Sequence, residues 1–487
     1  MGKYNKNKSQ KIKKSFYPDE CNNKMTFQEC EMAVLRSAIK ENKKTAGKRI
    51  ISDEDVQKMI KIVEEFIMKK KLVCYGGTAI NNILPENARF YDKEAEIPDY
   101  DFFSSTAMDD AKELADIYYN NGYTNVEAKA GVHFGTYKVF VNFIPIADIT
   151  QLPNQLFNSI KSESIKRSGI HYTPPNYLRM SMYLELSRPE GDVSRWEKVL
   201  ERLNLLNKYY PLKTSNCGEI DFQRKMELDM SEQEKIYFIT RDTLIDEGVV
   251  FFGGYASGLY SKQVTNVNNR ELQKIPDFDV LSEDLEKTAL ILKEQLEDNG
   301  IKNIQTKYND AIGEVIPENI EVSVGKHDIV AIIHKPIACH SYNEINIKDR
   351  LVKVATIDTI MSLYLSFVYG DKKLHDIRLL CMAEYLFNIQ EKNKLKQKSI
   401  FKRFTNQCYG KQITIEDIRA EKTKKFKELK NKQTSTEYQE WFLKYTPGDK
   451  KTHIPEQKKQ VKKSVTKTIK NKSKTNSKNK LLKVLGL

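Results

Sequence analysis

An internal repeat constrains the fold of this chain more than any other feature of its sequence. One copy starts at Ser52 and reads SDEDVQKMIKIVEEF, then LVCYGG, then IPDYDFF. The other starts at Ser231 and reads SEQEKIYFITRDTLIDEG, then VVFFGG, then IPDFDVL. The second glycine precedes the first aspartate of the acidic motif by 22 residues in one copy and by 23 in the other. Agreement in both order and spacing indicates two related structural units in one chain.

Each copy combines signals for helices with signals for strands. A Ser-x-x-acid capping box, Ser52/Asp55 or Ser231/Glu234, opens an amphipathic helix. A short apolar strand follows and ends at the two glycines, and an acidic strand and a third apolar strand come next. We therefore predict an α+β fold with two tandem units, each a small mixed sheet backed by helices.

Charge and composition divide the rest of the chain. Residues 1–14 carry six lysines and no acid, and residues 450–487 carry thirteen lysines and one glutamate. Such ends bury too little apolar surface to order themselves, so we expect both to be disordered and to attract polyanions. With a connector around 212–228, the predicted segments are a basic N-terminal segment (1–50), a first, catalytic unit (51–212), a second, degenerate unit (229–390), a helical segment (391–446) and a disordered lysine-rich tail (447–487).

The seven cysteines are scattered and form no CxxC or CxxH pair. This spacing supports neither a zinc ribbon nor a disulfide framework, so we predict reduced thiols. No apolar run approaches the roughly 20 residues that span a bilayer. The N-terminal residues also lack the apolar core of a secretory signal. We therefore expect a soluble intracellular protein with no membrane partner.

Three carboxylates of the first copy suit a metal site. Asp99 and Asp101 alternate along one predicted strand, so both side chains point to the same face. Two carboxylates so close together repel each other unless a cation lies between them. Asp148 ends a neighbouring apolar strand and can complete a set of oxygen ligands for Mg²⁺ or Mn²⁺. Two such ions would activate an attacking hydroxyl and stabilise a leaving oxygen, which is the chemistry of nucleotidyl transfer.

The glycine pair of the first copy fits the same reaction. Gly76, Gly77 and Thr78 are predicted to form a turn that opens a helix, whose free N–H groups attract phosphates. Glycine also lets the backbone approach a triphosphate closely. The chain lacks a P-loop, because its nearest match, Gly253-x-x-x-x-Gly258, has no lysine after it. Polar and basic residues further along are candidate contacts to the triphosphate or the base: Tyr172, Tyr177, Arg179 and Lys198.

These motifs resemble those of the DNA polymerase β-like nucleotidyltransferase superfamily. Over residues 50–390, the duplication, the length and the basic ends are most similar to the poly(A) polymerase catalytic subunits of large cytoplasmic DNA viruses, of the poxvirus and giant-virus type. The resemblance implies two tandem nucleotidyltransferase-like units, the second degenerate. In the first, Asp99 and Asp101 would bind both metals, and Asp148 would bind the metal that activates the RNA 3′-hydroxyl. The glycine turn would border the phosphates of ATP.

By the same resemblance, the chain would be a template-independent RNA 3′-end adenylyltransferase that uses ATP to polyadenylate mRNA. Its partners would be an RNA 3′ end and either a second copy of the chain or a separate processivity subunit. The implied location is the host cytoplasm, in viral factories, with the virion as a further site. Two other functions stay open: transfer of another nucleotide such as uridylate to RNA, and a non-catalytic role in RNA binding or processivity. The intact carboxylate triad argues against the non-catalytic role.

The second copy departs from this pattern at one position. It keeps its glycine pair and Asp277 and Asp279. Aligning the Pro-Ile-Ala motifs of the third strands, however, puts Cys339 where the first copy has Asp148. A thiol favours softer metals than Mg²⁺. We therefore predict that the second unit is catalytically inert and serves as a scaffold or RNA platform. Asp328 or another acid could still replace the missing ligand.

Overall fold

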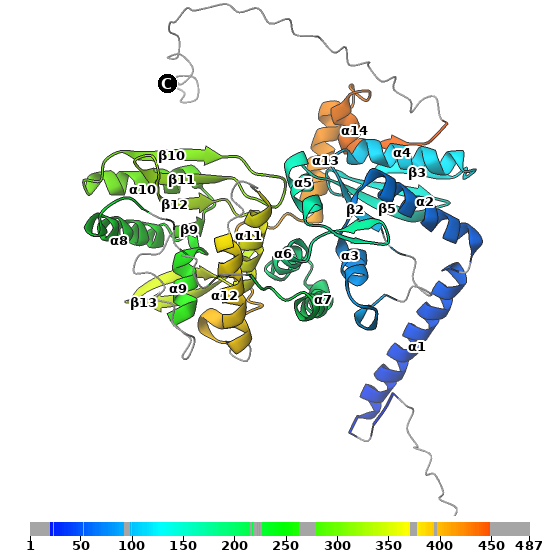
Figure 1. Cartoon of the computed structure of the whole chain (residues 1–487), viewed down its shortest axis with the longest axis horizontal. Coiled ribbons are helices and arrows are strands. Elements are labelled where there is room, and N and C mark those ends of the chain that lie inside the picture. Colours follow the sequence, from blue (N-terminus) through cyan, green and yellow to red (C-terminus); the bar gives the residue numbers. More distant parts are fainter. Residues whose placement is uncertain are drawn as a thin grey trace, which may run out of the picture. The chain divides into compact units, whose positions relative to one another are not determined.

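Two mixed β-sheets organise the protein in its computed structural model (Figure 1). The structure describes residues 20–22, 24–51, 53–91, 98, 100–214, 217, 222, 224, 226–262, 278–370, 377–393 and 397–448. The predictions for Asp99, Asp277, the first 19 residues and the tail beyond Gly448 therefore lie outside the described residues.

Each sheet has eight strands among the described residues. The order of the first sheet is β16-β3-β4-β5-β2-β1-β7-β6, and that of the second is β10-β11-β12-β9-β8-β14-β13-β15. The strands of the first sheet are β1 (Val73–Cys74), β2 (Tyr100–Ser104), β3 (Val126–Ala130), β4 (Thr136–Val141), β5 (Ile144–Gln151), β6 (Ile165–Arg167), β7 (Ile170–Tyr172) and β16 (Lys444–Tyr445). Those of the second are β8 (Val250–Phe251), β9 (Phe278–Leu281), β10 (Ile304–Asn309), β11 (Asn319–Val324), β12 (Asp328–His334), β13 (His340–Ile347), β14 (Arg350–Ala355) and β15 (Cys408–Tyr409).

Seven neighbouring strands have the same order and the same directions in both sheets. The run from β3 to β6 corresponds strand for strand to the run from β10 to β13. In both runs the strand that carries the acidic motif pairs in parallel with the apolar strand that comes later in the chain. These pairs are β2 with β5 and β9 with β12. The α+β fold with two tandem sheets, predicted from the repeat, is therefore confirmed. Only the eighth strand differs, because β16 joins one edge of the first sheet and β15 joins the other edge of the second.

Helices follow a similar order around the two sheets, except that, among the described residues, α5 has no counterpart between β12 and β13. The helices of the first sheet's part of the chain are α2 (Glu54–Lys70), α3 (Gly76–Ile83), α4 (Ala107–Asn120), α5 (Asn154–Ser162), α6 (Pro175–Leu186) and α7 (Trp196–Tyr209). Those of the second are α8 (Met230–Asp246), α9 (Gly254–Lys262), α10 (Leu285–Asp298), α11 (Ile357–Gly370) and α12 (Ile377–Asn393). The remaining helices are α1 (Phe27–Ile51), α13 (Ile415–Leu429), α14 (Thr436–Phe442) and the 3₁₀ helices η1 (Glu86–Ala88), η2 (Val193–Arg195) and η5 (Ser399–Phe401). None of the helices in the described ranges is both long and apolar enough to cross a membrane.

The apolar face predicted for the helix after Ser52 packs into the core. Val56, Met59, Val63, Phe66 and Ile67 of α2 are buried, and they recur at helical spacing because the helix lies against the sheet. Burying one such side chain contributes about 1.5–3 kcal/mol, so this stripe fixes how α2 sits on the sheet.

Aspartates cap the two equivalent helices, which corrects the serine caps expected from the sequence. The Asp53 side chain accepts a hydrogen bond from the Asp55 backbone N–H at the start of α2. Asp229 does the same for Glu232 at the start of α8, so Ser231 lies inside the helix. Ser52 lies outside the described residues. A carboxylate one or two residues away satisfies the free N–H groups as well as a serine does, and the sequence pattern alone could not separate the two.

Helices α6 and α11 join the two sheets into one compact unit that extends to Gly448. The rings of Tyr177 and Tyr369 meet edge to face at this contact, with their centroids 5.2 Å apart. The backbone N–H of Ser341 also donates to the carbonyl of Ser187, at 2.8 Å. The domain boundaries near 212 and 229 stay a prediction.

The C-terminal segment returns to the first sheet. Residues 391–446 are expected to be helical, and α13 and α14 lie there. The two-residue strand β16 follows them and pairs antiparallel with β3, placing Lys444 opposite Lys129 and Tyr445 opposite Ala128. The Tyr445 hydroxyl donates to the Asp116 carboxylate of α4, at 2.7 Å. A strand of two residues carries no periodicity, so no sequence pattern predicts it.

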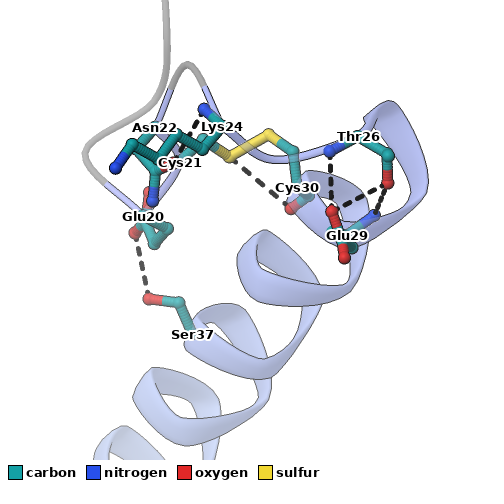
Figure 2. Close-up of a disulfide and its surroundings, with 8 residues drawn as sticks. All are labelled: Glu20, Cys21, Asn22, Lys24, Thr26, Glu29, Cys30 and Ser37. Carbon is teal, nitrogen blue, oxygen red and sulfur yellow. Dashed lines mark hydrogen bonds between the residues drawn. A yellow bond between two sulfur atoms is a disulfide. The ribbon is translucent and has the colours of Figure 1, made fainter.

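Three disulfides correct the prediction of reduced thiols. They join Cys21 to Cys30 at the start of α1 (Figure 2), Cys217 to Cys381, and Cys339 to Cys408. Cys74 remains a buried free cysteine. Two of the pairs are 164 and 69 residues apart in sequence. The fold brings their Cα atoms within 5.4 Å and 5.1 Å, which cysteine spacing cannot reveal.

Candidate active site

The register of β2 and β5 brings two of the predicted carboxylates together. Asp101 and Asp148 are directly paired residues of these parallel strands. Their neighbours Tyr100, Phe102 and Ala147 are buried, whereas both aspartates are only half-buried. Asp101 and Asp148 therefore share the face of the sheet that points away from the core. Asp99 belongs to the same motif but lies outside the described residues.

A lysine lies against the second of these carboxylates. Lys138 of β4 is the direct partner of Asp148 across the β4–β5 pair, and its ammonium forms an ion pair with the Asp148 carboxylate. The side chains of Lys138 and Asp148 are 35% and 20% exposed, so the pair remains within reach of solvent. Carboxylate oxygens fit Mg²⁺ or Mn²⁺, but Asp148 must share or release Lys138 to ligate an ion.

The glycine turn lies directly against Asp101. Gly76 opens α3 with a φ of +70°, and a Cβ at this position would lie 2.8 Å from Asp101 Oδ2. Both the left-handed backbone and the close approach require glycine here. The Tyr75 N–H donates to the Asp101 carbonyl at 2.9 Å, which fixes the turn to β2. The N-terminal N–H groups of α3 therefore begin beside the carboxylate face, where a phosphate would meet them.

Gly77 and Thr78 continue this turn into α3. A Cβ on Gly77 would lie 2.3 Å from the Tyr91 hydroxyl and 2.9 Å from Arg202 Nη1. Thr78 is buried in the first turn of the helix. The side chains of Tyr91 and Arg202 therefore leave no room for a side chain at Gly77, and the Arg202 guanidinium of α7 lies beside the turn.

Arg202 of α7 is the residue at this turn that the sequence did not single out. Its guanidinium lies over the Phe90 ring, 4.7 Å from the centroid, and donates to the Tyr91 hydroxyl at 2.8 Å. Stacking on an aromatic ring holds the fork of donors in place beside Gly77. Its spacing of four residues from Lys198 on one helix was the available signal, since both then share a face.

Two cations predicted to contact the triphosphate are placed very differently. Lys198 is exposed on α7, one turn from Arg202. Arg179, in contrast, is completely buried, and its guanidinium donates to Asn207, to Asn176 and to the Tyr210 carbonyl.

Burial lowers the pKa of Arg179 to about 10, which leaves it charged at neutral pH. Because its donors tie α6 to α7, the placement of Arg179 supports a structural role and gives no support to a contact with ATP. Tyr172 and Tyr177 are likewise buried, so the same holds for them.

Cys74 lies behind the carboxylates. It is completely buried at the end of β1. Burial, together with the neighbouring Asp101 and Glu64 carboxylates, raises the pKa of the Cys74 thiol. The thiol therefore stays protonated and contributes packing to the floor of the site without reacting.

The equivalent position in the second sheet is surrounded by different residues. Asp279 of β9 corresponds to Asp101, and a Cβ on Gly253 would lie 2.3 Å from its carboxylate. Its direct partner on β12 is Ile332, and the residue of β11 opposite Ile332 is Glu321. The third carboxylate is thus replaced by isoleucine.

This register corrects the alignment that put Cys339 opposite Asp148. Cys339 lies just before β13, beyond the end of β12, and is bonded to Cys408. Asp328 does not replace the missing ligand, because it lies at the start of β12 and accepts from the Glu227 N–H at 2.6 Å. The Pro-Ile-Ala motif occupies different structural positions in the two copies, which misled the sequence comparison.

A partly buried arginine pairs with the carboxylate of the second sheet. Arg224 Nη2 donates to Asp279 Oδ1 at 2.6 Å, and His334 Nε2 lies 3.6 Å from the same oxygen. Burial alone would raise the pKa of Asp279, but the Arg224 charge and the His334 contact outweigh it and hold that pKa below its usual range. Burial lowers the pKa of His334. Asp279 is therefore a charged carboxylate whose partner is a fixed guanidinium.

Comparisons with known proteins agree with the arrangement in the first sheet. Residues 61–192 match the family model described as "Poly(A) polymerase catalytic subunit". This part of the chain is therefore similar to poly(A) polymerase catalytic subunits. The matched residues include both paired aspartates and the glycine turn, so the family signature and the candidate site coincide.

Curated viral relatives share the same region. The "Putative poly(A) polymerase catalytic subunit" of African swine fever virus (strain Badajoz 1971 Vero-adapted) is 37% identical over 173 residues, 34% of this chain and 36% of the relative. The protein of the same name from Acanthamoeba polyphaga mimivirus is 30% identical over 225 residues, 44% of this chain and 37% of the relative. The chain therefore matches these poly(A) polymerase relatives over little more than a third of their length.

A solved structure extends the likeness to nearly the whole chain. The crystal structure of the Megavirus polyadenylate synthase superposes with a TM-score of 0.72, covering 92% of this chain and 90% of the other. The two sequences are 20% identical, so this likeness shows a common fold. The tandem arrangement of two sheets is thus shared with a polyadenylate synthase.

Proposed function

We propose that the protein is a template-independent RNA 3′-end adenylyltransferase, a poly(A) polymerase, that uses ATP. The observation that carries the proposal is the direct pairing of Asp101 and Asp148 beside the Gly76 turn. Carboxylates that face the N-terminus of a helix combine ligands for divalent cations with donors for a triphosphate. The family match over residues 61–192 supports the same reaction.

Asp101 and Asp148, with Asp99 from the same motif, would hold Mg²⁺ or Mn²⁺. When bound, the ions supply activation of the attacking 3′-hydroxyl and neutralise the departing pyrophosphate. The free N–H groups at the start of α3 would bind the triphosphate of ATP, and the fixed guanidinium of Arg202 would orient it. Lys138 would neutralise Asp148 before the ions enter, which keeps two neighbouring carboxylates from repelling each other.

The second unit would act as an inert scaffold or RNA platform. Ile332 offers no ligand, and Arg224 already neutralises Asp279. The division into units at 51–212 and 229–390 belongs to this proposal. Assembly with a second copy or a separate processivity subunit, and residence in the host cytoplasm and viral factories or in the virion, stay predictions.

Extension of a labelled oligo-RNA tests the function. The protein is incubated with the RNA, Mg²⁺ or Mn²⁺, and each of the four NTPs in turn. A long ladder with ATP alone is expected. A ladder with UTP alone would replace the proposal by uridylyl transfer. RNA binding without extension by any nucleotide would replace it by a non-catalytic role in RNA binding or processivity.

A further inference from the structure

Five residues form a straight row across the first sheet, and three of them are lysines. Lys444 of β16 pairs with Lys129 of β3, and Lys129 pairs with Lys138 of β4. Lys138 in turn pairs with Asp148, and Asp148 pairs with Asp101. Neighbouring strands lie about 4.8 Å apart, so the backbone positions of the three lysines lead to those of the two aspartates in even steps. We call Lys444, Lys129 and Lys138 the lysine row.

The lysine row lies on the open face of the sheet. Directly paired residues of neighbouring strands point to the same face, and the residues alternating with the row, among them Ala128, Val139 and Tyr445, are buried. Lys444 is exposed, and the side chains of Lys129 and Lys138 are 43% and 35% exposed. The row therefore forms a positive track that leads to the candidate active site without crossing the core.

Such a row has a cost that a polyanion would remove. Like charges directly opposite each other destabilise a sheet, and the row contains two such pairs in succession. Among the described residues, two ion pairs offset part of this repulsion: Glu127 with Lys129 at 3.1 Å, and Asp148 with Lys138. A chain of phosphates laid along the row would relieve the remainder.

A hollow with aromatic walls opens beside the row. Its volume is about 430 Å³, and its lining includes Glu127, Lys129, Phe140 and Phe143. The Lys129 ammonium lies 4.2 Å from the centroid of the Phe140 ring. Phe143 is 86% exposed, at a hairpin turn where it has a φ of +66°. A large apolar ring held in water by a left-handed backbone suits stacking by a nucleobase, because every base offers a flat face.

We infer that the lysine row and this hollow bind the nucleotides just upstream of an RNA 3′ end. The 3′-hydroxyl lies at Asp101 and Asp148, the preceding phosphates lie along Lys138, Lys129 and Lys444, and one base stacks on Phe143. The inference rests on the proposed function, because the carboxylates define which end of the RNA enters. It assigns the open face between β5 and β16 to the acceptor RNA and leaves the α3 turn to ATP.

The test measures binding of a labelled oligo(A) RNA as a function of salt. The variants are Lys129→Gln with Lys444→Gln, the matched Lys129→Arg with Lys444→Arg, and Phe143→Ala. Lys302→Gln, an exposed lysine after α10 of the second unit, serves as the remote control. The glutamine pair should lower the slope of log K against log salt by about 0.7 for each phosphate that the protein no longer neutralises. The arginine pair and the control should keep the wild-type slope.

Removal of the aromatic platform has a separate signature. Phe143→Ala should weaken RNA binding about ten-fold with an unchanged salt slope, because stacking involves no counterion release. The KM for ATP should stay at the wild-type value in all these variants.

Wild-type affinity and slope in the glutamine pair, while wild type still extends RNA with ATP, would overturn the inference and leave the function standing. A wild-type protein that neither binds nor extends RNA would instead remove the proposed function.

Discussion

The two sheets share a topology, but the equivalent aspartates Asp101 and Asp279 have different neighbours. Asp101 in the first sheet lies beside a second carboxylate, Asp148, which forms an ion pair with the partly exposed Lys138. Asp279 in the second sheet faces Ile332, and its cation is Arg224, whose side chain is 16% exposed. The partly exposed lysine can move aside for a metal ion, whereas the less exposed Arg224 guanidinium is held on the Asp279 carboxylate. The same backbone therefore supports a site that can open and one that is closed.

The largest expected effect on stability comes from Arg224→Met. The substitution leaves the Asp279 carboxylate buried without its partner, which should lower the free energy of unfolding by about 3–5 kcal/mol. Urea denaturation measures this decrease, with Arg224→Lys as the control that keeps the charge. RNA extension per folded molecule should be unchanged. A decrease below about 1 kcal/mol would show that Arg224 does not close the second site.

Gly76→Ala probes the close approach in the first sheet. Alanine is strained at a φ of +70°, which should cost about 1–2 kcal/mol of stability, and its Cβ would press on Asp101. Displacing that carboxylate should lower kcat about a hundred-fold. Gly122→Ala has the same backbone strain, at a φ of +94°, but no atom within 4 Å. It should lose stability and keep kcat, and equal decreases of kcat in both variants would contradict a catalytic need for the close approach.

Lowering the pH should reduce the difference in free energy of unfolding between wild type and Arg224→Met. The pKa of Asp279 is lowered in the folded protein, so its stabilising contribution is present above the ordinary carboxyl pKa of about 3.9 and is lost as the pH falls through the folded value. Without Arg224, only the smaller effects of His334 and Arg378 oppose the effect of burial on the carboxyl pKa, so the variant keeps less of this acid-sensitive stabilisation. Free energies of unfolding between pH 3 and pH 7 should therefore converge at low pH. A difference in free energy of unfolding that stays constant with pH would contradict the Arg224–Asp279 ion pair.

The smallest effect is expected from Lys138→Gln. Removing the ammonium frees Asp148 for a metal ion, so the Mn²⁺ concentration for half-maximal RNA extension should fall about three-fold at saturating RNA. Lys129→Gln, one strand further away, should leave that concentration unchanged. A higher Mn²⁺ requirement in Lys138→Gln would mean that the lysine assists the metal site and does not compete with it.

The repeat was enough to predict two sheets, the exposed face of Asp101 and a neighbouring strand that carries Asp148. Alternation along a strand sets the face of a side chain, and burial of Tyr100 and Phe102 follows from it. Pairing between strands was beyond the sequence, because register depends on which strands become neighbours. For this reason the sequence alignment gave Cys339 as the counterpart of Asp148. In the fold, Ile332 occupies that position.

Residues that act through distant partners were missed for the same reason. Lys138 and Lys444 gain a role only when β4, β3 and β16 line up beside β5. Arg202 meets the glycine turn only after α7 folds back over Phe90 and Tyr91. Arg179 had the right charge for a phosphate contact, yet its burial among Asn176, Asn207 and Tyr210 gives it a structural environment.

The most direct test of one open and one closed site compares Asp101→Asn with Asp279→Asn in RNA extension with ATP. Asp101→Asn should lower the rate at least about a thousand-fold, on the order of 4 kcal/mol of transition-state stabilisation, while RNA binding persists. Asp279→Asn should keep the wild-type rate per folded molecule. Equal decreases in both variants, or a fully active Asp101→Asn, would contradict the assignment of catalysis to the first sheet.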